Sequence, residues 1–380
     1  MDSIFTYEKP IGGRNLIGRQ KECSYIGNML ASGENIVMYG GPKTGKTSVI
    51  KQALTDMKIA GRQHMLAEAD FSSARELTEF LQTFGTRVLS AYANSEEGMR
   101  SIVERHLEGT HFVFDRKRYQ DYGEALSLNW EPDTDDMTRL FALPGKLAAE
   151  SGTKLILLLE NFDATIHFKE NEYVYQAFSA ALKERDRNFV SFIFTGSHIN
   201  AMRYIFRERR FFCRLVEHFI LGDLDDRDIM ENIVKGFLVT GKVIEKDIAL
   251  GISRMFRQHM WYINHLCSIC DYRTKGYINS NIVSDAVAIL ISVHEPYFKA
   301  LMDDLTNHQA NLLKASLEGV KRFSSGEVIE KYGLNSSANV RRVKDALQKK
   351  EILYFTDNDE PVIIDPLFEY WLRNNYYRMG

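Results

Sequence analysis

A glycine-rich octapeptide constrains this chain more than any other segment. Its residues are Gly40-Gly41-Pro42-Lys43-Thr44-Gly45-Lys46-Thr47, with Ser48 directly behind them. A short apolar run, residues 36–39, precedes the octapeptide, and residues 47–57 can wind as a helix. Gly40 and Gly45 let the backbone turn, so that successive amide N–H groups point into one concavity at the positive end of the helix. The segment therefore predicts a phosphate-binding loop.

The last residues of the loop indicate which anion it takes. Lys46 would reach the β- and γ-phosphate oxygens, and the Thr47 hydroxyl would take one position on a bridging Mg²⁺. We therefore expect ATP or ADP, with Mg²⁺, as the ligand. The alternative is an ordinary glycine-rich turn, which the strand before it and the helix after it disfavour.

Composition sets the broad class. A chain of 380 residues can bury a sizeable core and should divide into two or three domains. The longest apolar run, residues 155–159, is far shorter than a membrane span, and residues 1–4 lack the features of a secretory signal. We therefore expect a cytoplasmic protein without a membrane partner. The net charge of −3 excludes a uniformly basic surface but leaves room for a local basic patch.

The chain has four cysteines. Cys267 and Cys270 form a single C-x-x-C within an apolar, helix-like stretch, with no second Cys or His pair at zinc spacing nearby. Buried helix cysteines are the better interpretation, against a metal or redox site.

Alternating patterns predict an α/β fold for the first part of the chain. Five apolar runs alternate with helix-patterned stretches: 36–39, 64–69, 155–159, 190–195 and 216–221. This order is typical of a mostly parallel five-stranded sheet with helices on both faces, which places a nucleotide at the carboxyl ends of the strands. We assign residues 1–222 to this P-loop core.

The connection between the second and third runs is long. Residues 97–135 are charged and aromatic without clear periodicity, and Pro132 and Pro144-Gly145 interrupt the connection. We interpret it as an insertion near the nucleotide face, with plain solvated surface as the alternative.

Helices alone are predicted for residues 223–292. Four stretches with apolar residues at three and four spacing predict a helical lid over residues 223–292: 225–239, 245–256, 259–273 and 279–291. A third unit, residues 293–380, shows three helical stretches followed by two strands: 309–317, 325–332, 338–350, 352–355 and 362–364. That order describes a winged helix-turn-helix.

The third strand of the sheet ends in acidic and amide residues. Glu160 is expected to coordinate the metal together with Thr47, and Asn161 follows it. Because Asn161 can hydrogen-bond a water molecule but cannot take its proton, we expect slow or conditional hydrolysis. Glu160 itself, or Asp163, are the alternatives for activating water.

Two further positions are candidates for sensing the γ-phosphate. The fourth strand ends near Thr195 and Ser197, either of which could contact the phosphate or the attacking water, with a plain turn as the alternative. Further along the chain, arginines occur at positions 203, 207, 209, 210 and 214. Such a run is usually a solvated helix face. If one of them is catalytic, we expect it to be Arg214, just before the fifth strand.

Taken together, these motifs resemble the prokaryotic and archaeal ATPase family of the P-loop superfamily, which is related to AAA-type origin-recognition and signal-transduction ATPases. The resemblance covers nearly the whole chain. Residues 15–22 are similar to the box before the P-loop, which implies that Ile17, Gly18 and Arg19 cradle the adenine. Residues 194–197 resemble the sensor strand, residues 212–224 the entry into the lid, and residues 365–372 the closing helix of the winged helix.

Two departures from the family pattern stand out. The family usually has Asp-Glu where this chain has Glu160-Asn161, and its Gly-Gly-His-Pro lid turn corresponds here to residues 257–260, Arg-Gln-His-Met. The resemblance implies an ATP-driven switch and names no physiological process.

The predicted winged helix carries residues that could bind DNA. Arg341, Arg342 and Lys344 lie on the predicted recognition helix, where they could meet phosphates. The wing, residues 356–360, carries three acids where a DNA-binding wing favours bases. A protein partner or a second copy of the chain is the alternative for this surface.

Overall fold

The structure is a computed structural model that describes residues 5–379, so residues 1–4, on which the secretory-signal argument drew, lie outside it. The chain divides into two compact units. The sheet unit comprises residues 21–40 and 50–221, and the lid unit comprises residues 1–20, 41–49 and 222–380. The phosphate-binding loop beyond Gly40 therefore packs with the lid unit.

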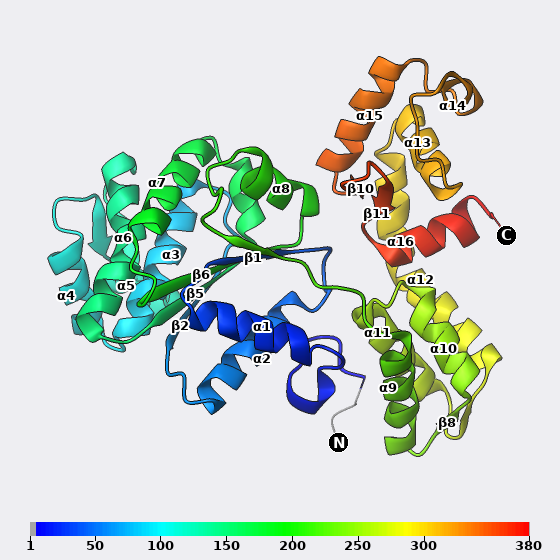
Figure 1. Ribbon diagram of the computed structural model, residues 1–380, viewed down its shortest axis with the longest axis horizontal. Coiled ribbons are helices and arrows are strands. Elements are labelled where there is room, and N and C mark those ends of the chain that lie inside the picture. The colour runs from blue at the N-terminus through cyan, green and yellow to red at the C-terminus, as the bar shows by residue number, and fades with distance from the viewer. Residues whose placement is uncertain (1–4, 380) are drawn as a thin grey trace. The chain divides into compact units, whose positions relative to one another are not determined.

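The sheet unit is built on five parallel strands, as predicted, and their order is β2-β5-β6-β1-β7. The strands are β1 (Ile36–Tyr39), β2 (Met65–Asp70), β5 (Leu155–Glu160), β6 (Val190–Gly196) and β7 (Glu217–Phe219). The central strands are buried on both faces, since α1 and α2 cover one face and α3, α6 and α7 the other (Figure 1). The helices of this region are α1 (Gln20–Ala31), α2 (Lys46–Ile59), α3 (Leu77–Tyr92), α6 (Thr134–Ser151), α7 (Asn171–Glu184) and α8 (Ile199–Arg203).

An aromatic core lies behind the carboxyl end of β5. Phe162 opens a short 3-10 helix, Phe162–His167, and is fully buried. Its ring centroid lies within 6.4 Å of those of Phe80, Tyr175, Phe178, Phe194, Phe206 and Phe212. Phe162 therefore anchors the segment that carries Glu160, Asn161 and Asp163.

The predicted insertion is an ordered substructure. It contains α4 (Glu96–His106), β3 (Phe112–Phe114), α5 (Arg116–Tyr122) and β4 (Leu126–Leu128), and β3 pairs antiparallel with β4. It packs on α3, where the Thr86 hydroxyl accepts hydrogen bonds from the Ala125 and Leu126 amides, both at 3.1 Å. The predicted interruption at Pro144-Gly145 is wrong, because α6 continues through Pro144 with Leu140, Leu143 and Leu147 buried on its packed face.

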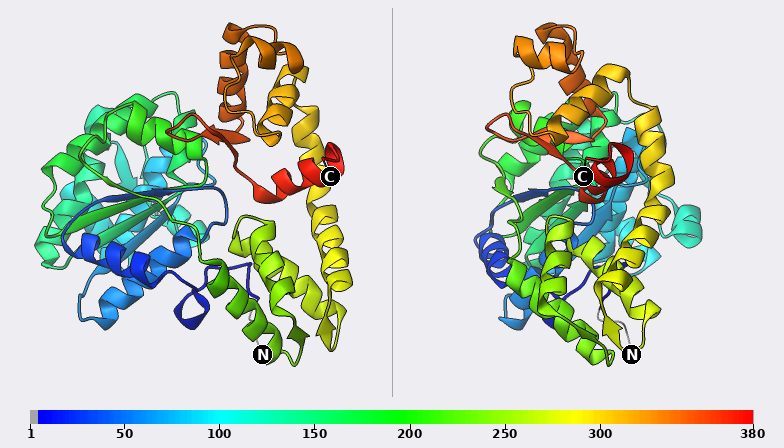
Figure 2. Two further views of the ribbon diagram at one scale, coloured as in Figure 1. Left: turned by 45° about the vertical axis from the view of Figure 1, so that its right-hand side comes forward. Right: turned by 90° about the vertical axis from the view of Figure 1, so that its right-hand side faces the viewer.

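The lid contains the helices that the sequence predicted. The last of them continues well beyond its predicted end. The lid contains α9 (Asp226–Val239), α10 (Lys246–Met255), α11 (Met260–Arg273) and α12 (Ser280–Asp303), with a short parallel pair β8 (Val243–Ile244) and β9 (Tyr277–Ile278). The predicted boundary at 292/293 lies inside α12, which runs unbroken through Pro296 (Figure 2). Burial of Phe298 and Met302 offsets the hydrogen bond that Pro296 removes.

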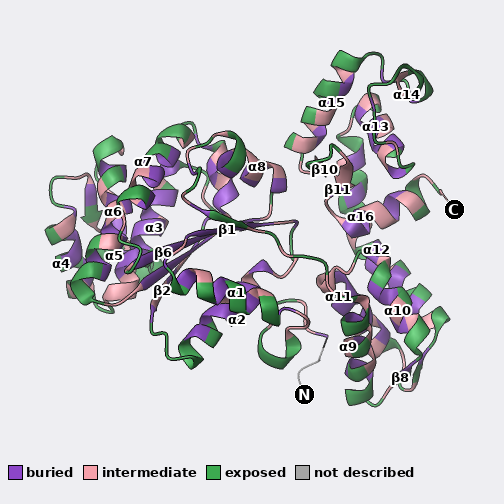
Figure 3. Ribbon diagram, in the orientation of Figure 1, coloured by how far each residue is buried: buried purple, intermediate pink, exposed green. Residues whose placement is uncertain are grey.

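The winged helix follows α12. Its elements are α13 (Asn307–Leu317), α14 (Gly326–Lys331), α15 (Ser337–Lys349), β10 (Leu353–Phe355), β11 (Pro361–Ile363) and α16 (Pro366–Trp371). Strands β10 and β11 pair antiparallel as the wing. Figure 3 shows α15 with an exposed outer face, while its inner residues Val340, Val343 and Leu347 are buried.

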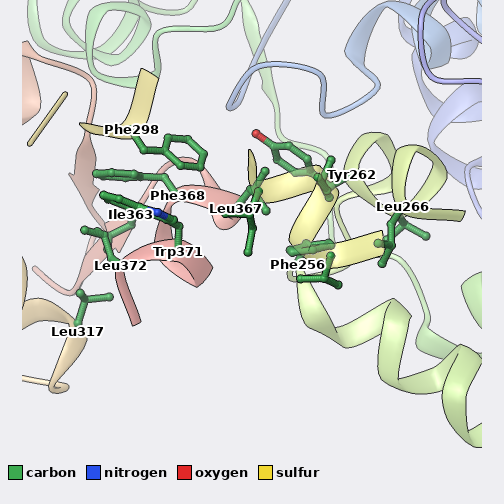
Figure 4. Close-up of a cluster of buried hydrophobic side chains, with 14 of the residues drawn as sticks. Phe256, Tyr262, Leu266, Phe298, Leu317, Ile363, Leu367, Phe368, Trp371 and Leu372 are labelled. Carbon is green, nitrogen blue, oxygen red and sulfur yellow. The ribbon is translucent and has the colours of Figure 1, made fainter. Parts of the chain in front are cut away.

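One apolar core runs through the lid and the winged helix. Phe298 of α12 packs on Phe368 and Trp371 of α16, with centroids at 5.2 and 5.6 Å, and Phe256 lies against Tyr370 at 5.6 Å (Figure 4). Cys267 and Cys270 are both free and buried in this core, as predicted, and burial raises the pKa of Cys270 to about 12. No helix within residues 5–379 combines the length and the apolar character needed to cross a bilayer.

Candidate functional site: the phosphate-binding loop and the edge of the sheet

The phosphate-binding loop joins β1 to α2, the context that the motif requires. Lys43 and Gly45 adopt left-handed backbone conformations, with φ of 59° and 93°. The Lys46 side chain is buried and bends back over the loop, where its ammonium donates to the Gly41 carbonyl at 2.9 Å. The Thr44 hydroxyl donates to the same carbonyl at 3.0 Å. A cation held over a loop of turned amides suits an anionic ligand.

Two lid residues contact this loop. The His259 ring Nε2 lies 3.1 Å from the Pro42 carbonyl, and the Lys43 ammonium lies 3.5 Å from the centroid of the Trp261 ring. Burial lowers the pKa of His259, so the neutral ring donates its Nε2–H to Pro42. Burial also lowers the pKa of Lys43, against the opposing charge of Asp365. The lid therefore holds the loop through a hydrogen bond and a cation–π contact.

The winged helix also reaches the loop. A Cβ added to Gly41 would lie 3.3 Å from the Ile364 side chain, so this glycine permits a close approach. The same stretch is tied to the lid, since the Tyr262 hydroxyl donates to Asp365 at 2.9 Å and the Arg257 guanidinium donates to the Ile363 carbonyl at 2.6 Å. Loop, lid and winged helix thus form one connected set of contacts inside the lid unit.

The N-terminal residues predicted to cradle adenine pack beside the start of the lid. The Arg19 guanidinium donates to the Gly222 carbonyl at 2.7 Å. Gly18 has φ of 64°, and a Cβ there would lie 2.9 Å from Leu224. Ile17 is half-buried. The Ser48 hydroxyl accepts from the Ile11 amide at 3.1 Å, so its side chain holds the N-terminal segment.

The sheet unit gathers polar groups at the carboxyl ends of neighbouring strands. Glu160, at the end of β5, is aligned with Asp70, at the end of β2. Asn161 follows in a left-handed conformation with φ of 55°, and its side-chain amide donates to Asp70 at 2.7 Å. Asn161 is therefore engaged with a carboxylate that the sequence reasoning missed, although its place at a strand end was a usable signal.

The end of β6 differs from the prediction in detail. Thr195 is only 4% exposed and lies in the interior, while Ser197 is half-buried. The exposed residue at this end is His198, which forms an ion pair with the buried Asp163. Strand β6 lies between β5 and β1, as the sensor interpretation requires.

The predicted arginines are dispersed. Arg214 is exposed in a left-handed turn with φ of 61°, just before β7. Arg209 forms an ion pair with Glu172.

The basic face of α15 is partly neutralised by the wing. Lys344 forms an ion pair with Asp359 at 2.7 Å and lies over the Phe355 ring at 3.8 Å, and Lys350 pairs with Asp304. Arg341 and Arg342 remain exposed.

Comparisons of fold agree with this architecture. A Walker-type ATPase of Pyrococcus abyssi superposes with a TM-score of 0.67 at 12% identity, covering 97% of this chain and 99% of that one. This chain has the fold of the Walker-type ATPases. The ORC2 protein of Aeropyrum pernix, in its ADPNP-ADP complexes, gives a TM-score of 0.56 at 14% identity, covering 99% of this chain and 98% of that one.

A comparison with protein families identifies one domain of the chain. Residues 296–374 match a family described as a probable winged helix domain, and they lie within the predicted third unit, residues 293–380. A search of curated proteins finds no match to the sequence. The chain therefore has a Walker-type fold with a winged helix.

Proposed function

We propose that this protein is an ATP-binding molecular switch with slow or conditional Mg²⁺-dependent hydrolysis. The observation that carries the switch is that the lid residues His259 and Trp261 contact Pro42 and Lys43 of the loop. Ile364, which follows β11, lies close enough to Gly41 that a Cβ added there would be 3.3 Å from its side chain. A triphosphate in the loop draws the Lys43 ammonium away from Trp261, since a phosphate charge attracts it more strongly than a ring face does. The state of the nucleotide then changes how the lid and the winged helix are held.

Each residue of the site has a proposed role. The backbone N–H groups of residues 40–48, apart from Pro42, and the Lys46 ammonium bind the phosphates, and Ile17, Gly18 and Arg19 bind the base. Thr47 and Glu160 hold Mg²⁺, which when bound neutralises charge on the phosphates. Ser197 and Arg214 are proposed to contact the γ-phosphate. The nucleotide complexes of the Aeropyrum pernix ORC2 protein support ATP or ADP as the ligand.

Slow turnover follows from Asn161. Its amide group cannot accept the proton of an attacking water, and it donates to Asp70 at 2.7 Å. Glu160 is still proposed to hold Mg²⁺. The site can therefore bind ATP with Mg²⁺ even where it hydrolyses ATP slowly.

Phosphate release tests whether the protein hydrolyses ATP. It is measured for the wild type, Lys46→Ala and Glu160→Gln, and each protein is assayed with and without DNA. We expect release by the wild type, background release by Lys46→Ala, and at least about tenfold slower release by Glu160→Gln with ATP still bound. Equal release by the wild type and Lys46→Ala in every condition would show that the chain does not turn over ATP. A nucleotide-stabilised scaffold would then be the better description.

The second candidate function is a DNA-binding regulator that uses nucleotide only as a ligand. The exposure of Arg341 and Arg342 favours it. If α15 contacts phosphates, Arg341→Ala should weaken DNA binding and reduce the slope of log affinity against log salt by about 0.9. Lys344→Ala is the matched control, because Asp359 already neutralises that lysine. Absence of DNA binding at low salt would eliminate this function.

A further inference from the structure

Residues 5–11 run from the core of the lid to the start of α2, and we call this segment the strap. Phe5 is 1% exposed, and its ring centroid lies 4.8 Å from that of Phe237 in α9. Gly236 makes room for the ring, because an added Cβ would be 2.5 Å from the Phe5 Cζ. A ring buried against a residue without a side chain anchors this end of the strap in the lid.

The next two residues of the strap lie against α11. The side-chain amide of Asn264, a residue only 5% exposed, donates to the Thr6 carbonyl at 3.0 Å. The Tyr7 ring stacks on His265, with centroids 4.3 Å apart and planes at 13°, and it lies at 89° to the Trp261 ring, 5.6 Å away. Because the Asn264 side chain is buried, its hydrogen bond is costly to lose. Three consecutive residues of the strap are therefore fixed to the lid.

The other end of the strap is tied to the helix that follows the phosphate-binding loop. The Ile11 amide donates to the Ser48 hydroxyl at 3.1 Å, in the first turn of α2. Between its ends the strap lies beside Trp261, whose ring also holds the Lys43 ammonium at 3.5 Å. Pro10, directly before Ile11, has a fixed φ and shortens the flexible part of the strap. All of these residues belong to the lid unit, so the strap joins loop and lid within one compact unit.

We propose that the strap couples the phosphate-binding loop to the lid, with Phe5 as its anchor. Tyr7 positions the Trp261 ring for its contact with Lys43. The inference rests on the proposed function and names the segment through which the switch acts. A phosphate in the loop draws Lys43 from Trp261 and binds the first amides of α2. Because the strap is fixed at both ends, a shift at its α2 end displaces Phe5, and α9 with it.

Amide hydrogen exchange of the full chain tests the coupling, measured with and without a saturating Mg²⁺-bound ATP analogue. The loop contacts α11 directly through Trp261, so α9 is the element that reports on the strap. In the wild type we expect the analogue to change exchange in residues 41–49, in the strap and in α9. Phe5→Ala should keep the change in residues 41–49 and reduce the change in α9 by at least about threefold, and Phe5→Leu should keep most of both.

Three glycines inserted between Glu8 and Lys9 provide a second test that leaves the anchor in place. Both residues are exposed, so the insertion lengthens the strap without disturbing the contacts at its ends. It should reduce the change in α9 as Phe5→Ala does, while calorimetry gives an affinity for the analogue within about twofold of the wild type. Tyr7→Ala should reduce the change in Trp261 emission on nucleotide binding, and Tyr7→Phe, which keeps the ring, should restore it.

Tyr272→Ala is the matched control, because Tyr272 is 93% exposed near the end of α11 and the variant loses an aromatic ring from the same lid. It should respond to the analogue as the wild type does. Thermal unfolding checks each fold, and the insertion decides the matter if Phe5→Ala does not fold. A change in α9 as large as that of the wild type, in either folded Phe5→Ala or the insertion variant, would overturn the proposal. A wild type that binds the analogue without any change in the lid would contradict the proposed function, and the coupling with it.

Discussion

Replacing Lys46 with alanine is expected to lower the affinity for ATP by at least about a hundredfold. Its ammonium lies over the loop, 2.9 Å from the Gly41 carbonyl, at the place where the phosphates are proposed to bind. Each charge-assisted hydrogen bond to phosphate contributes about 1.5–3 kcal/mol, and Lys46 would make two, to the β- and γ-phosphates. Titration calorimetry with a non-hydrolysable ATP analogue measures the change.

Lys58→Ala provides the control for this measurement. Lys58 lies in the last turn of α2 and is exposed, so the variant loses an equal charge from the same helix. We expect its affinity to match the wild type. If Lys46→Ala and Lys58→Ala bind the analogue equally well, the loop is not the nucleotide site.

Replacing Phe162 with alanine is expected to destabilise the protein by about 3–5 kcal/mol, because it opens a cavity within the aromatic core of the sheet unit. The ring is fully buried and lies 4.9 Å from the Phe194 ring, centroid to centroid. Phe162→Leu should cost about 1.5 kcal/mol, since it keeps most of the volume. Urea denaturation followed by circular dichroism gives the free energies.

The same substitution tests how the site is supported. Phe162 lies between Asn161 and Asp163, so the variant that still folds should also release phosphate more slowly than the wild type. Tyr173→Ala, at a position 58% exposed, serves as the control and should change stability by less than about 0.5 kcal/mol. A cost below about 1 kcal/mol for Phe162→Ala would contradict the anchoring role.

The elements that the sequence predicted are those with a strong periodic signal. Runs such as residues 155–159 are apolar on both faces, and only a central strand of a covered sheet requires that. The two-residue and three-residue strands β8, β9, β3 and β4 carry too little pattern to be recognised. Pro144 suggested a break and the lid was predicted to end at residue 292, yet α6 and α12 continue through Pro144 and Pro296 because packing of the flanking apolar residues outweighs one lost hydrogen bond.

The candidate site also has parts that the sequence predicts and parts that it does not. The loop and the strand ends follow from local spacing, so Lys46, Thr47 and Glu160 could be named from the sequence. The contacts of Trp261 with Lys43, of Asn161 with Asp70 and of His198 with Asp163 join residues distant in sequence. No local pattern specifies them, since they depend on backbone turns such as the left-handed Asn161 and on how helices pack.

The proposed switch depends on the contacts of the loop as well as on its sequence. The loop is held by the lid through His259 and Trp261 and approached by the winged helix through Ile364. Those contacts connect the loop to the winged helix. We therefore expect bound nucleotide to change the contact between the loop and the lid.

Trp261 fluorescence during nucleotide titration reports on this contact, since the Lys43 ammonium lies 3.5 Å from the Trp261 ring. We predict a saturable change in emission with a Mg²⁺-bound ATP analogue and a smaller one with ADP. Lys46→Ala should lack the change because it does not bind, and Trp261→Phe should lack it while calorimetry still detects binding. Wild-type emission that stays constant when calorimetry shows the site to be saturated would contradict the switch.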